Sequence, residues 1–324
     1  LTGDKCSLMC SHCRGVLLKS MADAKEKNLI EIIESRYDSY NKMDQEESRD
    51  VNGLNGVLIS GGFNSKGVLE LDRHYAQIKQ IKKTFSKLKI FIHAGFVDKK
   101  MAYMLKETGC DGVLINIIGS INAIENVYNL KKFTPLDYYD SLKNLKKEGL
   151  KTAPHIVVGL DSLNPDFEYE ALKNIIEIGA DWLVLVSVKD LFRKYRKHIP
   201  DFSGSKYKNL QKNLKNNYAE YFNTEILTNN NYYKSDINFG IFRDKENSEK
   251  ILKLFKFARR LCPKLKISLG CAKPSGKTGE ALEMRLIDSG IDSIAFPSEK
   301  TLIYANKKNI EFEFMQNCCA LIDK

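Results

Sequence analysis

Residues 89–119 read KIFIHAGFVDKKMAYMLKETGCDGVLINIIG. The segment opens with a short apolar, β-branched run at 89–95 and closes with a second run at 112–119, both typical of buried strands. The stretch between them, 99–109, spaces its apolar residues as an amphipathic helix does and ends in glycine, a common helix C-cap. The order strand, helix, strand predicts a parallel pair joined by a helical crossover.

The same alternation recurs along nearly the whole chain. Further strands are predicted at 56–60, 153–160, 182–188, 266–271 and 292–297, and the residues just before Cys6 are available for a first strand. Further helices are predicted within 74–88, 138–149 and 168–179. Eight strands, each followed by a helix, predict an α/β fold of the (β/α)8 TIM-barrel type, full or partly open. Functional groups are then expected at the carboxyl ends of the strands.

One segment interrupts this rhythm. Residues 189–248, between the sixth and seventh predicted strands, are far longer than an ordinary connection with its helix. Residues 189–217 contain nine Lys or Arg but only two Asp. We therefore predict a basic insertion, part helix and part loop, within the barrel.

Composition limits the class of protein. The 324 residues are 43% hydrophobic, and no apolar run approaches the length of a membrane span, so we expect a globular, cytoplasmic protein. The formal net charge of +10 fits solvated lysine-rich faces, attraction to nucleic acid or attraction to an acidic protein, and charge alone does not decide among them. Eight cysteines in a reducing compartment favour metal ligation over disulfides.

Three of these cysteines stand close together in LTGDKCSLMCSHCRG (1–15). Cys6, Cys10 and Cys13 have C-x3-C-x2-C spacing. A structural zinc site normally has four ligands, and His12 directly precedes Cys13, which leaves it little freedom to reach the same metal. Three thiolates can instead hold three irons of a [4Fe-4S] cluster and leave the fourth iron open. The spacing favours the cluster, with zinc or incidental cysteines as the alternatives.

This triplet, in the loop after a first barrel strand, resembles the radical S-adenosylmethionine (SAM) superfamily, and His12 matches the aromatic residue often found before the third cysteine. The superfamily's Gly-Gly turn, which binds the amino group of SAM, is similar to LISGGFNS (58–65), with Ser60, Gly61 and Gly62 in place. Phe63 stands where an acidic residue is usual. The resemblance implies that backbone groups of this turn bind SAM.

Other strand ends follow in the order that the superfamily would have. The resemblance puts Asn116 at the ribose, the segment from Ile156 through Val157 to Gly159 beside the adenine, and Val186 and Ser187 in the second adenine region. His93 and His155, at strand ends, are candidates for contact with SAM or substrate. Each match alone is also what an ordinary α/β strand or turn shows. Together they imply one radical SAM barrel domain over 1–324, with a [4Fe-4S] cluster and SAM.

Several stretches resemble a narrower group, the archaeal-type two-protein lipoyl synthases: LTGDKCSLMCSHCRGVLLKSM, LISGGFNSKGVLELD, IHAGFVD, APHIVVGL, LGCAKPSGK and NCCALI. This likeness implies a sulfurtransferase that inserts sulfur into an octanoyl chain on a carrier-protein lysine. Its partners would be a lipoyl-domain or H-type carrier protein, a second radical SAM subunit, and a reductant such as ferredoxin or flavodoxin. Neither membrane nor nucleic acid is expected. The segment VSVKDLFRKYRKHIPDF (186–202) departs from that group and leaves the substrate open.

Sulfur insertion requires a source of sulfide, for which a second iron–sulfur cluster is the plausible reservoir. Cys271 ends the seventh predicted strand, and Cys318 with Cys319 lies in a tail, 310–324, that we expect to fold back to the barrel mouth. Cys110 and Cys262 are interpreted as structural. The alternative functions are a radical SAM enzyme of other outcome, biotin-synthase-like or in cofactor biosynthesis, and a metal-bearing RNA-binding protein that uses the basic insertion.

Overall fold

The computed structural model describes residues 1–24, 28–47, 54–161, 166–189 and 244–314. Most of the predicted insertion and the tail with Cys318 and Cys319 lie outside these residues. Residues 244–248, which we assigned to the insertion, form the first turn of an outer helix.

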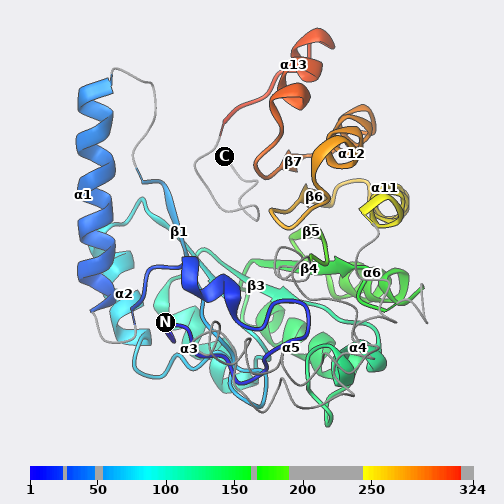
Figure 1. The fold of residues 1–324 in the computed structure, drawn as a ribbon. Helices are drawn as coiled ribbons and strands as arrows, with labels where there is room; N and C mark the ends of the chain where they lie inside the picture. The colour runs from blue at the N-terminus through cyan, green and yellow to red at the C-terminus, as the bar shows by residue number, and fades with distance from the viewer. Residues whose placement is uncertain (25–27, 48–53, 162–165, 190–243, 315–324) are drawn as a thin grey trace, which may run out of the picture.

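Seven parallel strands form one sheet in the described part of the chain, and their order in the sheet is their order in the sequence. The sheet is curled, and its two edge strands, β1 and β7, lie apart (Figure 1). The strands are β1 (Gly56–Ile59), β2 (Lys89–His93), β3 (Gly112–Asn116), β4 (Thr152–Val158), β5 (Trp182–Ser187), β6 (Lys266–Leu269) and β7 (Ser293–Ile294). This arrangement confirms the predicted α/β barrel in its partly open form.

The prediction of a strand before Cys6 is wrong. Residues 1–5 contain a turn, in which Gly3 adopts a φ of 61° and Lys5 N donates to Thr2 O. This segment crosses the end of β1 instead of pairing along it, and the Leu1 nitrogen donates to the Ser60 carbonyl at 2.7 Å. The described residues therefore form a seven-stranded half-barrel.

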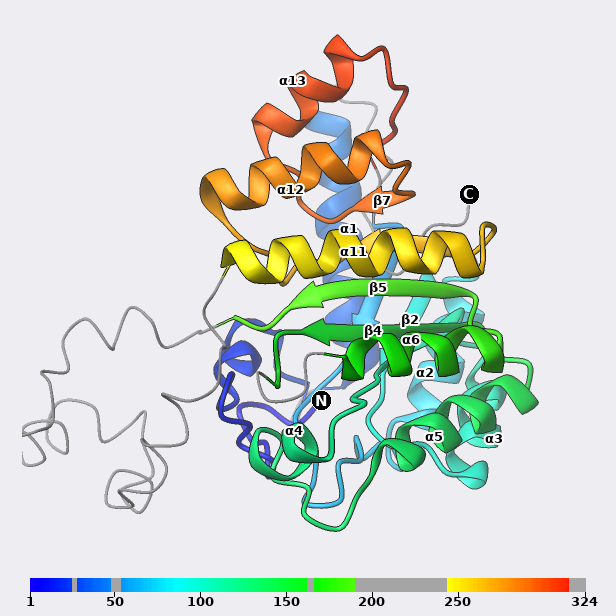
Figure 2. The same ribbon diagram turned by 90° about the vertical axis from the view of Figure 1, so that its right-hand side faces the viewer.

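Helices cover the convex face of the sheet (Figure 2). The helices of the described residues are the 3-10 helix η1 (Val16–Ser20), which follows the cysteine loop, and α1 (Leu29–Glu47), α2 (Tyr75–Thr84), α3 (Lys99–Thr108), α4 (Ile121–Asn126), α5 (Pro135–Lys147), α6 (Phe167–Ile178), α11 (Asp244–Leu261), α12 (Gly276–Asp288) and α13 (Glu299–Lys307). Local signals set their ends. Asp98 caps α3 by accepting from Met101 N at 2.7 Å, and Gly109 ends that helix in the left-handed region.

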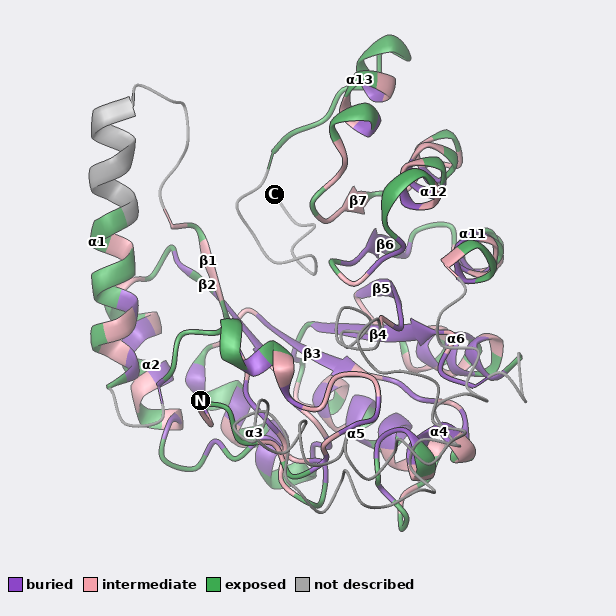
Figure 3. Cartoon of the chain, viewed as in Figure 1, coloured by how far each residue is buried: buried purple, intermediate pink, exposed green. Residues whose placement is uncertain are grey.

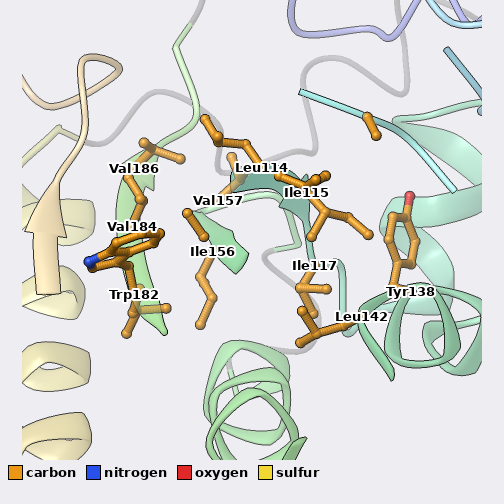
Figure 4. Close-up of a cluster of buried hydrophobic side chains, with 14 of the residues drawn as sticks. Leu114, Ile115, Ile117, Tyr138, Leu142, Ile156, Val157, Trp182, Val184 and Val186 are labelled. Atoms are coloured by element: carbon orange, nitrogen blue, oxygen red, sulfur yellow. The ribbon is translucent and has the colours of Figure 1, made fainter. Parts of the chain in front are cut away.

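The core lies between the sheet and this helical layer, where the strands are buried and the outer helix surfaces exposed (Figure 3). All seven residues of β4 are buried, as expected of a parallel strand covered on both faces. Ile115 and Ile117 point toward Leu142 and Tyr138 of α5 (Figure 4). In the described part of the chain, no helix is both long enough and apolar enough to cross a membrane.

The opposite, concave face is the interior of the half-barrel. Paired residues on neighbouring parallel strands share a face, so the pairings place Asn116, His155, Val184 and Ser268 on this side. Phe91 of β2 and Trp182 of β5 meet across it with ring centroids 6.2 Å apart. Because β2 and β5 are not neighbours in the sheet, this contact closes the interior near the amino ends of the strands.

Candidate cluster and cofactor site

The cysteine loop packs against the carboxyl ends of the first strands. Ser7 N donates to Phe63 O at 2.8 Å, beyond β1, and Ser11 N donates to Val127 O at 2.9 Å, beyond β3. Asn129 Nδ2 donates to Leu8 O at 2.6 Å. These bonds bring the loop with Cys6, Cys10 and Cys13 to the carboxyl ends of the strands, where functional groups are expected. The N-terminal segment lies at this end of the sheet (Figure 2).

The three thiols differ in environment. Cys10 is 5% exposed, whereas Cys6 and Cys13 are half-buried. A hydrogen bond with Cys10 lowers the pKa of Cys13 to about 7, and the same bond, with burial, raises the pKa of Cys10. The contact favours one thiolate and one thiol when no metal is bound.

This donor set fits a cluster better than a single ion. Among the described residues, no three His, Cys, Asp or Glu side chains gather closely enough to hold one metal ion. A four-ligand zinc site needs such a group, whereas in a [4Fe-4S] cluster each thiolate binds a different iron. Burial also lowers the pKa of His12 to about 4, so this ring is neutral beside the cysteines.

The Gly-Gly turn after β1 is in direct contact with the cysteine loop. A β-carbon on Gly62 would lie 1.9 Å from Lys5 O and 2.7 Å from Cys6 Cα. Gly62 N donates to Thr2 Oγ1 at 2.6 Å, and a β-carbon on Gly61 would lie 3.0 Å from the same oxygen. Ser60, Gly61 and Gly62 thus form a turn that adjoins Cys6 without room for a further side chain.

The predicted adenine residues meet at the carboxyl ends of β4 and β5. Gly159 has a φ of 91°, and its nitrogen donates to Glu168 Oε1 at 3.1 Å. Asn247 of α11 donates to Ser187 Oγ at 3.0 Å. Ser187 pairs with Val158, so its side chain lies on the convex face, where α11 holds it, whereas Val157 lies on the concave face and is 8% exposed.

Sequence reasoning missed Asn247 and Glu168. A β-carbon on Gly159 would lie 2.5 Å from Asn247 Oδ1, so α11 fixes the backbone of this turn. Glu168 is fully buried and forms a 2.6 Å ion pair with Lys250, also on α11. The only signal for Asn247 was a polar residue on the apolar face of a helix.

His93, Asn116 and His155 adjoin one another inside the half-barrel. The rings of His93 and His155 stack with centroids 5.6 Å apart and 18° between their planes. Asn116 pairs with His155 in the sheet and is close enough to affect the pKa of His93 and of Tyr128. Burial raises the pKa of Tyr128, and the nearby Cys10 and Cys13 raise it further. Tyr128 therefore lies between the cysteine loop and these side chains.

Cys271 follows β6, whereas the cysteine loop bonds to residues that follow β1 and β3. It is exposed at the end of β6, beside Lys273, which is buried and pairs with Glu283 at 2.5 Å. Lys273 also donates to the carbonyl oxygens of Ala295 and Phe296, which joins the loops after β6 and β7. Cys110 and Cys262 are half-buried, and Cys110 Sγ donates to Leu105 O in the outer helical layer.

Several buried polar atoms in this region lack a hydrogen-bond partner in the described structure. They are Ser11 Oγ, His12 Nδ1 and Ser268 Oγ. Folded proteins satisfy about nine-tenths of such atoms. Their concentration around the cysteine loop and the concave face is what an absent cofactor and substrate would explain, so the residues present fit a SAM-binding cluster.

Comparisons with known proteins extend this picture. No protein-family model matches the chain. It is 27% identical to biotin synthase of Aquifex aeolicus (strain VF5) over 110 residues, 34% of this chain and 32% of that protein. The structure resembles HydG, a maturase of the [FeFe]-hydrogenase, with a TM-score of 0.54 and 12% identity over 90% of this chain and 54% of that one. HydG from Carboxydothermus hydrogenoformans gives a TM-score of 0.53 and 12% identity over 92% and 58%.

The chain thus aligns with less than two thirds of each of these proteins, and the HydG structures establish the likeness of fold alone. The biotin synthase match adds a likeness in sequence. Neither comparison bears on the lipoyl synthase resemblance, which stays a prediction.

Proposed function

We propose that this chain is a radical SAM enzyme in which Cys6, Cys10 and Cys13 hold a [4Fe-4S] cluster. The observation that carries the proposal is the packing of Gly62 against Cys6 at the carboxyl end of β1. This contact joins the two motifs that cluster and SAM would share. When bound, the cluster and SAM supply one-electron cleavage of the SAM sulfonium, which yields methionine and a 5′-deoxyadenosyl radical.

The role of the chain's own residues would be to bind SAM and to orient it. The turn Ser60–Gly62 would receive the methionine end of SAM, Asn116 the ribose, and Val157, Gly159 and Ser187 the adenine side. Glu168 and Asn247 fix the last of these positions through the contacts described above. No acid–base dyad is needed, since these residues only hold the reacting groups in place.

Buried apolar side chains cover much of the concave face, which would keep water from groups bound there. Val157, Val184 and Val186 are buried on it, and the Phe91–Trp182 contact closes its base. A radical formed at the open end would meet substrate in an apolar enclosure, which protects it from side reactions.

For the reaction itself we propose sulfur insertion into an octanoyl chain on a lipoyl-domain or H-type carrier, with a ferredoxin or flavodoxin as reductant. The lipoyl synthase resemblance supports this choice. A sulfide-donating cluster would take Cys271, which is exposed after β6, and Cys318 or Cys319, which lie outside the described residues, as its ligands. The biotin synthase match favours a second candidate, a biotin-synthase-like reaction on another substrate.

Anaerobic reconstitution tests the proposal. Protein reduced with dithionite should convert SAM to 5′-deoxyadenosine, and an octanoyl-lysine peptide should then gain sulfur. Cleavage of SAM without sulfur transfer would retain the radical SAM assignment and reject the lipoyl type. Iron analysis of a protein lacking Cys6, Cys10 and Cys13 tests the second cluster: about four remaining irons, lost on changing Cys271, would support it, and none would reject it.

A further inference from the structure

The loop that follows α4 is hydrogen-bonded to the cysteine loop by the side chain of Asn129. Its amide nitrogen Nδ2 donates to Leu8 O at 2.6 Å and to Met9 O at 3.4 Å. These are the two carbonyl groups that directly precede Cys10 in the chain. A primary amide has two N–H donors, so one side chain can hold both oxygens. Asn129 therefore fixes the backbone through which the chain enters Cys10.

The cysteine loop has a backbone conformation that its own residues do not favour. Met9, directly before Cys10, has a φ of 42°, and Arg14, directly after Cys13, has a φ of 43°. Residues other than glycine are disfavoured in this left-handed region, so contacts with the surrounding structure must maintain it. The conformation in which Cys10 and Cys13 share a hydrogen bond thus depends on contacts from outside the loop.

Three successive residues after α4 supply such contacts. Val127 O accepts from Ser11 N at 2.9 Å. The centroids of the Tyr128 and His12 rings lie 5.3 Å apart. Asn129 itself has a φ of 58°, a left-handed conformation that asparagine adopts more readily than most residues. The position therefore suits an asparagine in two respects, its turn conformation and the two donors of its amide.

We propose that Asn129 is a positioning residue for the iron–sulfur cluster, because its amide holds the cysteine loop in the conformation that ligates three irons. The inference rests on the proposed function, in that the cysteine loop must be the cluster site. It adds a residue outside that loop which determines how firmly the cluster is retained. Ligands that are held in place before iron binds lose less conformational freedom on binding, so the cluster should leave sooner when the amide is absent.

Two variants separate the amide of Asn129 from its turn. Asn129→Gly removes the amide and adopts a positive φ without strain. Asn129→Asp keeps the size of the side chain and tolerates this φ, but it replaces the donor with a carboxylate that faces two carbonyl oxygens. Asn126→Ala is the matched control, because Asn126 lies on α4 and its Nδ2 donates to Asn122 Oδ1 at 2.8 Å.

Alkylation of the full-length apoprotein gives a readout that needs no cluster. Cys10 is 5% exposed, so its reaction with iodoacetamide, followed by peptide mass spectrometry, reports opening of the loop. We expect this reaction to be about tenfold faster in both Asn129 variants and unchanged in Asn126→Ala. Cys262, which follows α11, should react at the same rate in all four proteins. Equal acceleration at Cys262 would show that the whole fold is lost and would overturn the positioning role.

Iron retention by the reconstituted protein is the second readout. Ferrous iron released to bathophenanthroline would be followed under anaerobic conditions. We expect release to be about tenfold faster from both Asn129 variants than from wild type, with no change in Asn126→Ala. Wild-type iron retention in Asn129→Asp would overturn the inference, since only the turn would then matter, and so would wild-type protection of Cys10.

The outcomes separate this inference from the proposed function. Wild-type protein that assembles no cluster and does not cleave SAM would reject the proposed function. Wild-type protein that cleaves SAM, together with Asn129 variants that match its iron retention and its protection of Cys10, would reject this inference alone.

Discussion

Gly62 and Cys6 are so close that a β-carbon on Gly62 would lie 2.7 Å from both Cα and Cβ of Cys6. Gly62→Ala must therefore displace the cysteine loop or the turn after β1. We expect iron content to fall to less than about half, because three ligands from one loop need one backbone conformation. Gly290→Ala is the control: it introduces left-handed strain at a φ of 78° with no atom within 4 Å. Full iron content in Gly62→Ala would contradict the proposed site.

A substitution at Gly159 tests the proposed adenine-binding residues separately from the cluster ligands. A β-carbon there would lie 2.5 Å from Asn247 Oδ1, and the φ of 91° disfavours any side chain. Gly159→Ala should leave iron content intact while weakening SAM binding, about tenfold by equilibrium dialysis, since the turn must move. Loss of iron with normal SAM affinity in the remaining holoprotein would place Gly159 outside the SAM site.

Features of the fold and site that depend on neighbouring residues could be predicted from the sequence, whereas those that depend on tertiary contacts could not. The strands at 89–95 and 153–160 could be read from the sequence because their apolar, β-branched runs are bounded by helix caps, and both are confirmed by β2 and β4. The strand before Cys6 could not be judged, since tertiary bonds such as Leu1 N to Ser60 O decide the path of that segment.

The site divides in the same way. Cys6, Cys10 and Cys13 were found from their spacing, which is a local property. Tyr128 and Asn129 approach the cysteine loop from more than 100 positions away, as the bond from Asn129 to Leu8 shows, and no periodic pattern marks such a contact. The stacking of His93 on His155 likewise depends on strand register.

The Lys273–Glu283 pair is expected to stabilise the loops that carry Cys271. Burial alone would raise the pKa of Glu283, but hydrogen bonds from Lys273, Thr301 and Ser298 hold it below its usual value. Glu283→Gln leaves a buried ammonium without its counter-charge and should lower the free energy of unfolding by about 3 kcal/mol. Chemical denaturation would measure this.

Glu280→Gln is the control for that measurement, since its pair with Lys300 is more exposed and should contribute less than about 1 kcal/mol. Because the folded pKa of Glu283 is lowered, its contribution is complete above the ordinary carboxyl pKa and is lost as pH falls through the lowered value. Equal effects of the two substitutions at neutral pH would show that the buried pair is not stabilising.

The buried histidines should give the free energy of unfolding a second dependence on pH. Their folded pKa values, about 4 for His93 and about 3 for His155, lie below the ordinary 6.5. The unfolded chain binds protons below about pH 6.5 that the folded chain excludes, so stability is complete above that pH and falls toward pH 4. As the pH falls from about 6.5 to 5, each histidine should lower the free energy of unfolding by about 2 kcal/mol. Urea unfolding of His155→Asn should show a smaller loss on acidification than wild type, and an identical loss would contradict the assignment.

The most direct test of the central claim is 5′-deoxyadenosine formation by Cys10→Ala, compared with Cys110→Ala, after anaerobic reconstitution with iron and sulfide. Cys110 is a suitable control because it lies in the outer helical layer, where its thiol contacts Leu105 O. The proposed site predicts that Cys10→Ala is folded but forms no 5′-deoxyadenosine above the protein-free background, whereas Cys110→Ala forms it at the wild-type rate. Formation of 5′-deoxyadenosine by Cys10→Ala at the wild-type rate would contradict the assignment of Cys6, Cys10 and Cys13 to the SAM-binding cluster.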